Sequence, residues 1–225
     1  MCGRYSLAAD KTMLSMSFPG LDIPDDMPLR YNIAPTQHVP VIANLPEPRL
    51  EFFHWGLIPS WAKDAEIGNR MINARAETLL EKPSFRNAFR RRRCLIPAEG
   101  FYEWQRSPDG KIKTPMHIRL KSGRPFAFAG LWEQWLHPGG SEIWSCTIIT
   151  TEPNDLMASI HNRMPVILRP EDYAQWLSSG ERQSEALQAL LVPYESDEMT
   201  AYAVTKVVNH PGNDTPACLE PAGDA

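Results

Sequence analysis

The sequence predicts a single α+β domain over residues 1–225, built on a largely antiparallel sheet that curls like a barrel and carries short flanking helices. Strand-like apolar runs dominate the middle of the chain, and short helix-like segments lie between and after them. The chain has 21 prolines, and their recurrence up to about residue 60 excludes long helices there. No regular strand–helix alternation and no glycine-rich phosphate loop occurs, which argues against doubly wound and α/β-barrel folds.

Each expected element follows from a local pattern. Phe85 and Phe89 stand four residues apart, which predicts a short amphipathic helix there. Pro97 and Gly100 are expected to interrupt the strand that contains them. The expected strands are 39–45, 50–58 after a turn at 46–49, 94–105, the stretch from the PDG turn at 108–110 to residue 120, 125–135, 142–151 and 199–209. The expected helices are 84–93, 153–161, 169–179 and 184–191, and a loose tail is expected from about residue 211.

The composition is that of a globular protein, with 43% hydrophobic and 22% charged residues. No apolar run is long enough to span a membrane, and the start lacks the basic-then-apolar pattern of an export signal. We therefore expect a cytoplasmic protein, in the space that holds the nucleoid in a bacterium. We also expect a monomer. The four cysteines are far apart and should be free thiols, with Cys94 and Cys146 buried in strands. No metal site is expected, because Cys and His are scattered.

The net charge of −4 hides a separation of charge along the chain. Residues 63–93 hold nine Lys or Arg against four Asp or Glu, whereas residues 171–198 hold seven acids against one Arg. A basic region on an acidic protein can serve a local phosphate site. The four arginines at 90–93 either bind DNA or form a solvated helix end, and the sequence does not distinguish the two.

Cys2 directly follows the start methionine. Removal of Met1 would leave an α-amine and a thiol on one residue, with reference pKa values of about 7.7–8.0 and about 8.5. Such a pair can condense with an aldehyde to a thiazolidine ring, or act as an N-terminal nucleophile. The plain alternative is that Cys2 is merely an arbitrary second residue.

Three further stretches place polar groups in apolar or aromatic surroundings. Asn73 lies in MINARAET, Glu103 lies between two aromatic residues in GFYEW, and His161 lies in SIHNRMPVIL. Carboxylate and imidazole groups can move protons near neutral pH, and an amide can orient a reacting group. Each residue also has a plain explanation: Asn73 could hold a turn, Glu103 could face solvent, and His161 could cap a helix end.

Eight blocks, taken together and in order, resemble one family. They are MCGRYS at the start, RYNIAPTQ at 30–37, HWGLIPSWA at 54–62, INARAET at 72–78, RRCLIPAEGFYEW at 92–104, AFAGLWE at 127–133, TIITTEPN at 147–154 and IHNRMPVIL at 160–168. The chain resembles the SOS-response-associated peptidases, also called abasic-site processing proteins. The resemblance continues more weakly to about residue 209.

The resemblance implies that Cys2 becomes the N-terminus and crosslinks to abasic sites in single-stranded DNA, without any cofactor. Its amine would form a Schiff base with the opened sugar, and its thiol would close a thiazolidine that shields the lesion. The family's roles fall here on Cys2, Asn73, Glu103 and His161. A lyase side activity through the Schiff base and self-processing that removes Met1 are also implied.

The DNA contacts implied by the resemblance are less specific. Phosphate contacts would come from Arg4, Arg75 and Arg163, stacking or wedging from Trp61 and Pro35, and weaker contributions from Asn32 and Thr150. Two other readings stay open. One is a thiol peptidase or N-terminal nucleophile hydrolase that uses Cys2 repeatedly, and the other is a non-catalytic single-strand DNA-binding module.

Overall fold

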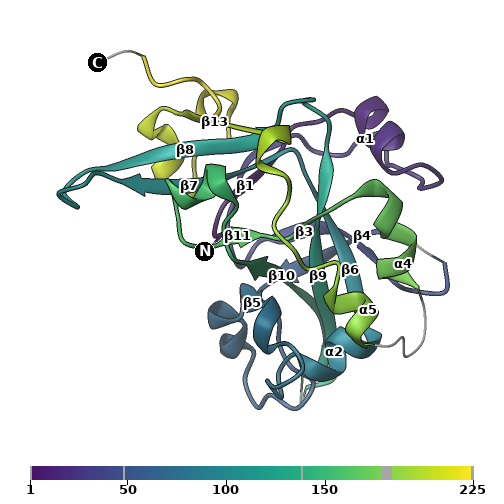
Figure 1. Ribbon diagram of the computed structural model, residues 1–225. Coiled ribbons are helices and arrows are strands. Elements are labelled where there is room, and N and C mark those ends of the chain that lie inside the picture. Colours follow the sequence, from purple (N-terminus) through teal and green to yellow (C-terminus); the bar gives the residue numbers. More distant parts are fainter. Residues whose placement is uncertain (1, 48, 138, 179–183, 224–225) are drawn as a thin grey trace.

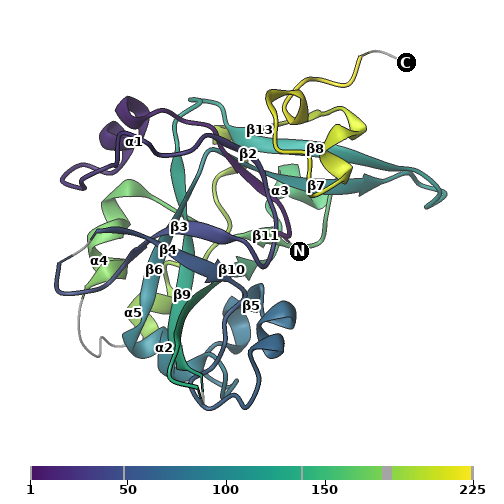
Figure 2. The same cartoon turned by 180° about the vertical axis from the view of Figure 1, so that it is seen from behind.

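The computed structural model describes residues 2–47, 49–137, 139–178 and 184–223 (Figure 1). Two sheets lie one above the other, with the short helices around them, and Figure 2 shows the same arrangement from behind. The expected α+β class with a curled, mostly antiparallel sheet is confirmed. Met1 and the parts of expected segments at residues 48, 179, 224 and 225 lie outside the described residues.

The larger sheet closes into a barrel of five strands. Hydrogen bonding runs from β10 through β4, β3, β6 and β9 and back to β10, with β4 and β10 parallel and the other neighbours antiparallel. Three short strands extend this sheet. Its strands are β3 (His38–Ala43), β4 (Leu50–Trp55), β6 (Arg93–Ala98), β9 (Phe126–Leu136), β10 (Glu142–Thr151), β5 (Asn73–Arg75), β11 (Met164–Pro165) and β12 (Ile167–Leu168).

The smaller sheet is open and antiparallel, in the order β13-β8-β7-β1-β2. Its strands are β1 (Tyr5–Leu7), β2 (Arg30–Ile33), β7 (Gly100–Arg106), β8 (Lys113–Leu120) and β13 (Met199–Ala203). The ring of Tyr5 joins the two sheets, because it lies 5.4 Å from Trp55 of β4 and 5.7 Å from Phe128 of β9. Edge-to-face pairs of this kind stabilise a shared core, and here they fix the start of the chain between the sheets.

The helices are short. The α-helices are α1 (Lys11–Ser17), α2 (Arg86–Arg91), α3 (Asp155–Ala158), α4 (Tyr173–Leu177) and α5 (Ser184–Gln188). The 3-10 helices are η1 (Ala65–Arg70), η2 (Ala76–Thr78), η3 (Pro170–Asp172), η4 (Ser196–Glu198), η5 (Lys206–Asn209) and η6 (Pro216–Cys218). Asp10 caps α1 through a bond to the backbone of Met13, a helix that the proline-rich composition did not lead us to expect.

Three expectations about elements need correction. The break between β6 and β7 falls at Glu99, whereas Pro97 lies within β6 opposite Ala127. The strand expected at 199–209 ends at Ala203 and continues into η5. The segment after residue 211 is not a loose tail, because Cys218 is fully buried and Pro221 forms a β-bridge with Val204.

Arg93 takes neither of the two roles considered for the arginine run. It is fully buried, and its guanidinium donates to carbonyl oxygens at the end of α2 (Phe89, 3.0 Å; Arg90, 2.6 Å) and beside α4 (Trp176, 2.8 Å; Ser178, 2.6 Å). The last carbonyls of a helix lack partners within the helix, and a cation there is favourable. Arg93 therefore ties the ends of two helices to the barrel.

Candidate active site

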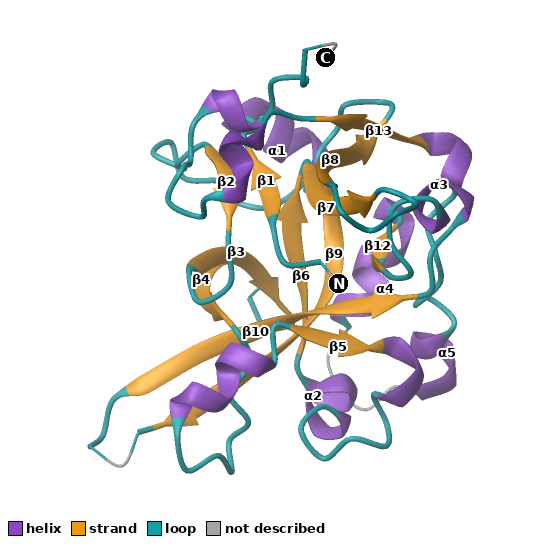
Figure 3. Ribbon diagram, turned by 90° about the vertical axis from the view of Figure 1, so that its left-hand side faces the viewer, coloured by secondary structure: helices purple, strands orange, loops and turns teal. Residues whose placement is uncertain are grey.

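Cys2 lies at the junction of the two sheets. The backbone N–H of Tyr102 donates to the Arg4 carbonyl at 2.9 Å, so the residues before β1 run alongside β7. Figure 3 shows this end of the chain in the centre of the molecule, between the smaller sheet and the strands β5 and β10. Cys2 is fully buried, although it is the second residue of the chain.

Asn73 holds the backbone of Cys2. It begins β5, which pairs with β10 in parallel and opposite Ile148, and its Nδ2 donates to the Cys2 carbonyl at 2.8 Å. The Oδ1 atom of Asn73 is buried and has no hydrogen-bond partner among the described residues. A buried polar atom without a partner is costly, which is typical of a functional site. The amide is therefore poised to orient a group beside Cys2.

Glu103 and His161 face each other next to Cys2. Glu103 Oε2 lies 4.0 Å from His161 Nε2, and the side chain of Glu103 is only 6% exposed. Burial and the negative charge of Glu103 together raise the pKa of the Cys2 thiol well above its ordinary value. The thiol is therefore protonated at neutral pH.

The backbone of Arg163 fixes the orientation of the His161 ring. The backbone N–H of Arg163 points at His161 Nδ1 at 3.1 Å, and a backbone N–H can only donate. Nδ1 also lies 3.2 Å from the Arg163 carbonyl, so these contacts fit a proton on either ring nitrogen, and Nε2 is the nitrogen on the side of Glu103. Four residues far apart in sequence, Cys2, Asn73, Glu103 and His161, therefore meet at one place.

The three arginines expected at phosphates have different surroundings. Arg75 is exposed, whereas Arg163 forms a bidentate pair with Glu77 (2.7 and 3.0 Å) and donates to the Thr150 carbonyl at 2.7 Å. Arg4 is half-buried against the ring of Trp104, 5.6 Å from its centroid. Each of the three arginines lies two residues from Cys2, Asn73 or His161 in the sequence. The guanidinium groups of Arg4 and Arg163 are already held by other protein groups.

The four remaining DNA-contact candidates differ in exposure. Trp61 is 58% exposed and Pro35 is half-buried, so both can meet a ligand. Asn32 and Thr150 are fully buried. Asn32 accepts a hydrogen bond from Arg4 at 2.8 Å, and the carbonyl of Thr150 accepts from Arg163, so these two can act only through the arginines.

Sequence reasoning missed Glu77 and Trp104 as neighbours of the site. Both lie inside blocks that were singled out, Glu77 in INARAET and Trp104 in GFYEW. Glu77 and Arg163 are 86 positions apart, so no local sequence pattern could predict that they form an ion pair. Trp104 could have been noticed, because Arg guanidinium groups often stack on Trp rings.

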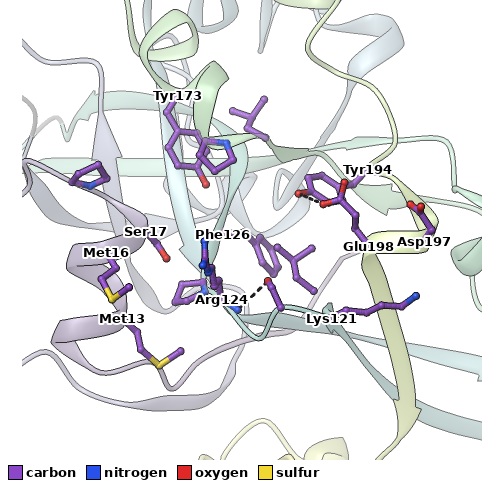
Figure 4. A pocket seen from close by; sticks show the side chains of 16 residues that line it. Met13, Met16, Ser17, Lys121, Arg124, Phe126, Tyr173, Tyr194, Asp197 and Glu198 are labelled. Carbon is purple, nitrogen blue, oxygen red and sulfur yellow. Dashed lines mark hydrogen bonds between the residues drawn. The ribbon is translucent and has the colours of Figure 1, made fainter.

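A separate cavity of about 740 Å³ lies between α1, the β8–β9 turn and α4 (Figure 4). It is lined mainly by apolar side chains such as Met13, Phe126 and Tyr173, with Lys121 and Glu198 at its border. None of the four clustered polar residues lines it.

Among the described residues, no group of three or more His, Cys, Asp or Glu could hold a metal ion. In the same part of the chain, no helix is long and apolar enough to cross a membrane.

Two known proteins illustrate what the chain is similar to. The chain is 49% identical over 224 residues to the abasic site processing protein YoqW of Bacillus subtilis, covering 98% of this chain and 99% of that one. It is 31% identical over 275 residues to the abasic site processing protein HMCES of Mus musculus, covering 99% of this chain and 76% of that one.

The fold also has solved counterparts. A crystal structure of a protein from Bacteroides thetaiotaomicron superimposes with a TM-score of 0.87 at 29% identity, covering 98% of this chain and 100% of that one. A second, from Bordetella bronchiseptica, gives a TM-score of 0.76 at 27% identity, covering 91% and 100%. The family model described as SOS response associated peptidase matches residues 1–211. The chain therefore belongs to the SOS response associated peptidase (SRAP) family.

Proposed function

We propose that this protein processes abasic sites by crosslinking to them through Cys2 once Met1 has been removed. The observation that carries the proposal is the meeting of Cys2 with Asn73, Glu103 and His161 at the start of the chain. The names of the relatives YoqW and HMCES, both abasic site processing proteins, support the substrate. The expected partner is single-stranded DNA, whose opened abasic sugar presents an aldehyde.

The proposed reaction forms two bonds at the sugar C1′ carbon. The α-amine of Cys2 adds to the aldehyde, and loss of one water gives the protonated Schiff base. The Cys2 sulfur then adds to the same carbon while Glu103 accepts the thiol proton, and the electron pair of the C=N bond moves to the nitrogen, which gives a neutral thiazolidine. The product mass is that of protein plus DNA minus one water. Holding both groups on one residue makes the second step intramolecular, which accelerates it greatly.

Each neighbour has a role that its geometry permits. His161, whose Nε2 lies on the side of Glu103, donates a proton to the ring oxygen of the closed sugar and so opens it to the aldehyde. Glu103 accepts the proton that leaves the amine and passes it on during loss of water, with His161 as its partner at 4.0 Å. Asn73 keeps the Cys2 backbone in place through its 2.8 Å bond. In this proposal Glu103 also assists hydrolysis of the Met1–Cys2 bond.

DNA binding in this proposal is independent of sequence. Arg4, Arg75 and Arg163 lie in the same blocks as the reacting residues and supply phosphate contacts, while exposed Trp61 offers a ring for base stacking. Pro35 lies in the loop before β3 and can wedge against a base. Because phosphate contacts carry no sequence information, the protein can act wherever a base has been lost.

The test is intact-protein mass spectrometry of the protein before and after mixing with a short abasic single-stranded oligonucleotide. We expect free protein without Met1 and a stable adduct, formed without borohydride, at the mass given above. Retention of Met1, or absence of an adduct from protein that lacks Met1, would refute the proposal.

A turnover hydrolase that uses Cys2 is the second candidate, since the family description names a peptidase. The two candidates differ for Cys2→Ser. A hydrolase can retain some activity with a serine nucleophile, whereas the crosslinker should lose its stable adduct, because an oxygen ring of this kind opens readily.

A further inference from the structure

The contacts of Arg4 lead away from Cys2 and into the C-terminal segment. Arg4 donates from one terminal nitrogen to Asn32 Oδ1 and to the Val208 carbonyl, both at 2.8 Å. Its guanidinium lies over Trp104, whose indole N–H donates to Asn209 Oδ1 at 2.8 Å. The placement of this arginine thus depends on residues about 200 positions later in the chain.

Asn32 is itself held by the same segment. Its Nδ2 lies within hydrogen-bond distance of the carbonyls of Val208 (3.3 Å), His210 (3.1 Å) and Asn213 (2.6 Å). The side chain is fully buried, so it cannot be a surface contact for DNA. Its function in the fold is to connect Arg4 to the C-terminal segment.

Asp214 fastens the segment to β2. Its Oδ1 accepts from the backbone N–H of Tyr31 at 2.5 Å and of Asn32 at 2.9 Å, and its Oδ2 pairs with Arg30. A small second core covers this junction, formed by Tyr102, Val204, Val208 and Cys218. The part of the chain beyond residue 211, where the family match ends, is therefore integral to the arrangement around Arg4.

We infer that the C-terminal segment 204–222 is a positioning element for Arg4, with Asp214 and Asn32 as positioning residues. This inference rests on the proposed function, in which Arg4 contacts a DNA phosphate next to the lesion. An arginine side chain has large rotamer freedom, and fixing it before the ligand arrives lowers the entropy cost of the contact. Asp214 thus strengthens binding of a polyanion although it carries a negative charge.

Asp214→Asn tests this inference. If Asp214 positions Arg4, its replacement should weaken DNA binding, whereas removal of a negative charge alone should strengthen it. The asparagine keeps the size but loses the ion pair with Arg30 and one of the acceptor sites. Affinity for an intact fluorescent single-stranded oligonucleotide, measured by anisotropy at several salt concentrations, should fall about 5- to 20-fold. The slope of log affinity against log salt concentration should become less steep, by the amount that about one phosphate contact contributes. The control Asp197→Asn, which removes the same charge at the distant cavity, should leave binding unchanged or slightly tighter.

A double-mutant cycle with Arg4→Lys separates positioning from general destabilisation. If Asp214 acts through Arg4, the double variant should bind about as weakly as Arg4→Lys alone. Additive losses would overturn the inference, as would Asp214→Asn binding as tightly as Asp197→Asn. Adduct formation at saturating abasic DNA should stay near the wild-type rate in Asp214→Asn, and a large fall there would also overturn it. Failure of wild type to form any adduct would refute the proposed function, while the binding measurements on intact DNA would still decide the inference.

Discussion

The contact between Asn73 and Cys2 provides the sharpest test of the site. Asn73→Ala removes the 2.8 Å hydrogen bond to the Cys2 carbonyl and leaves the side chains of Glu103 and His161 in place. The residue lies in a short outer strand, β5, and its other amide atom has no partner among the described residues. The variant should therefore change the orientation of Cys2 far more than it changes the stability of the fold.

The two effects can be given magnitudes. One neutral hydrogen bond contributes about 1 kcal/mol to stability, which corresponds to a fall in Tm of about 2–4 °C for a chain of this size. A misplacement of about 1 Å in a reacting group can lower a rate about 100-fold. We therefore expect adduct formation to slow about 10- to 100-fold at saturating abasic DNA, equivalent to about 1.4–2.7 kcal/mol in the barrier.

Asn44→Ala is the matched control. Asn44 accepts from the Arg93 N–H (3.0 Å) and the Trp132 indole (2.9 Å), and donates to the Arg91 carbonyl (3.0 Å), all away from Cys2. Loss of three bonds should cost about 3 kcal/mol and lower the Tm by about 6–12 °C, with the adduct rate unchanged below that temperature. Single-turnover gel assays measure the rate of adduct formation, and differential scanning calorimetry measures the Tm. If Asn73→Ala crosslinks at the wild-type rate, the reasoning about orientation is refuted.

Three further predictions concern chemistry, acid stability and packing. Cys2→Ala keeps the amine but cannot close the ring, so Schiff-base β-elimination should increase strand nicking at abasic sites in a denaturing gel; intact DNA would count against an imine route. Burial lowers the pKa of His117 to about 3 from an unfolded value near 6.5, so stability should fall as the pH drops from about 6.5 to 3, by roughly 4–5 kcal/mol. His117→Phe should remove most of this acid sensitivity in urea titrations at pH 7 and pH 4, and an unchanged pH dependence would exclude His117 as its source. Arg93→Met leaves four helix-end carbonyls without their donor and should lower the Tm by about 6–12 °C in calorimetry, whereas an unchanged Tm would show that water replaces the guanidinium.

Much of the barrel could be predicted from local patterns, because its strands are long and apolar. β9 and β10 occupy Phe126–Leu136 and Glu142–Thr151, close to the expected 125–135 and 142–151. Closure of the barrel through the parallel pair of β4 and β10 could not be predicted, since no local signal encodes which strands become neighbours. The C-terminal segment was misjudged because its order comes from contacts with β2 and β7, not from its own periodicity.

The chemistry of the site was accessible from residue types, but its connections were not. Cys2, Asn73, Glu103 and His161 each stand in unusual sequence surroundings, and their placement follows from the resemblance. Asn32 and Thr150 lie in equally distinctive blocks and are buried, because a motif does not reveal which of its members face a ligand. Glu77 and Asp214 were missed because their partners Arg163 and Arg30 are remote in sequence.

Burial of the Cys2 thiol also determines the order of the proposed steps. Its raised pKa, caused by burial and by Glu103, leaves little thiolate at neutral pH, and the thiolate is the nucleophilic form. We therefore expect the amine to attack the aldehyde first. Once the Schiff base has formed, its positive charge lies beside the thiol and opposes the effects that keep the thiol protonated. Glu103 can then receive the thiol proton as sulfur adds to C1′. A thiol that becomes reactive only in the presence of the imine is protected from oxidation and stray electrophiles until an abasic site has been captured.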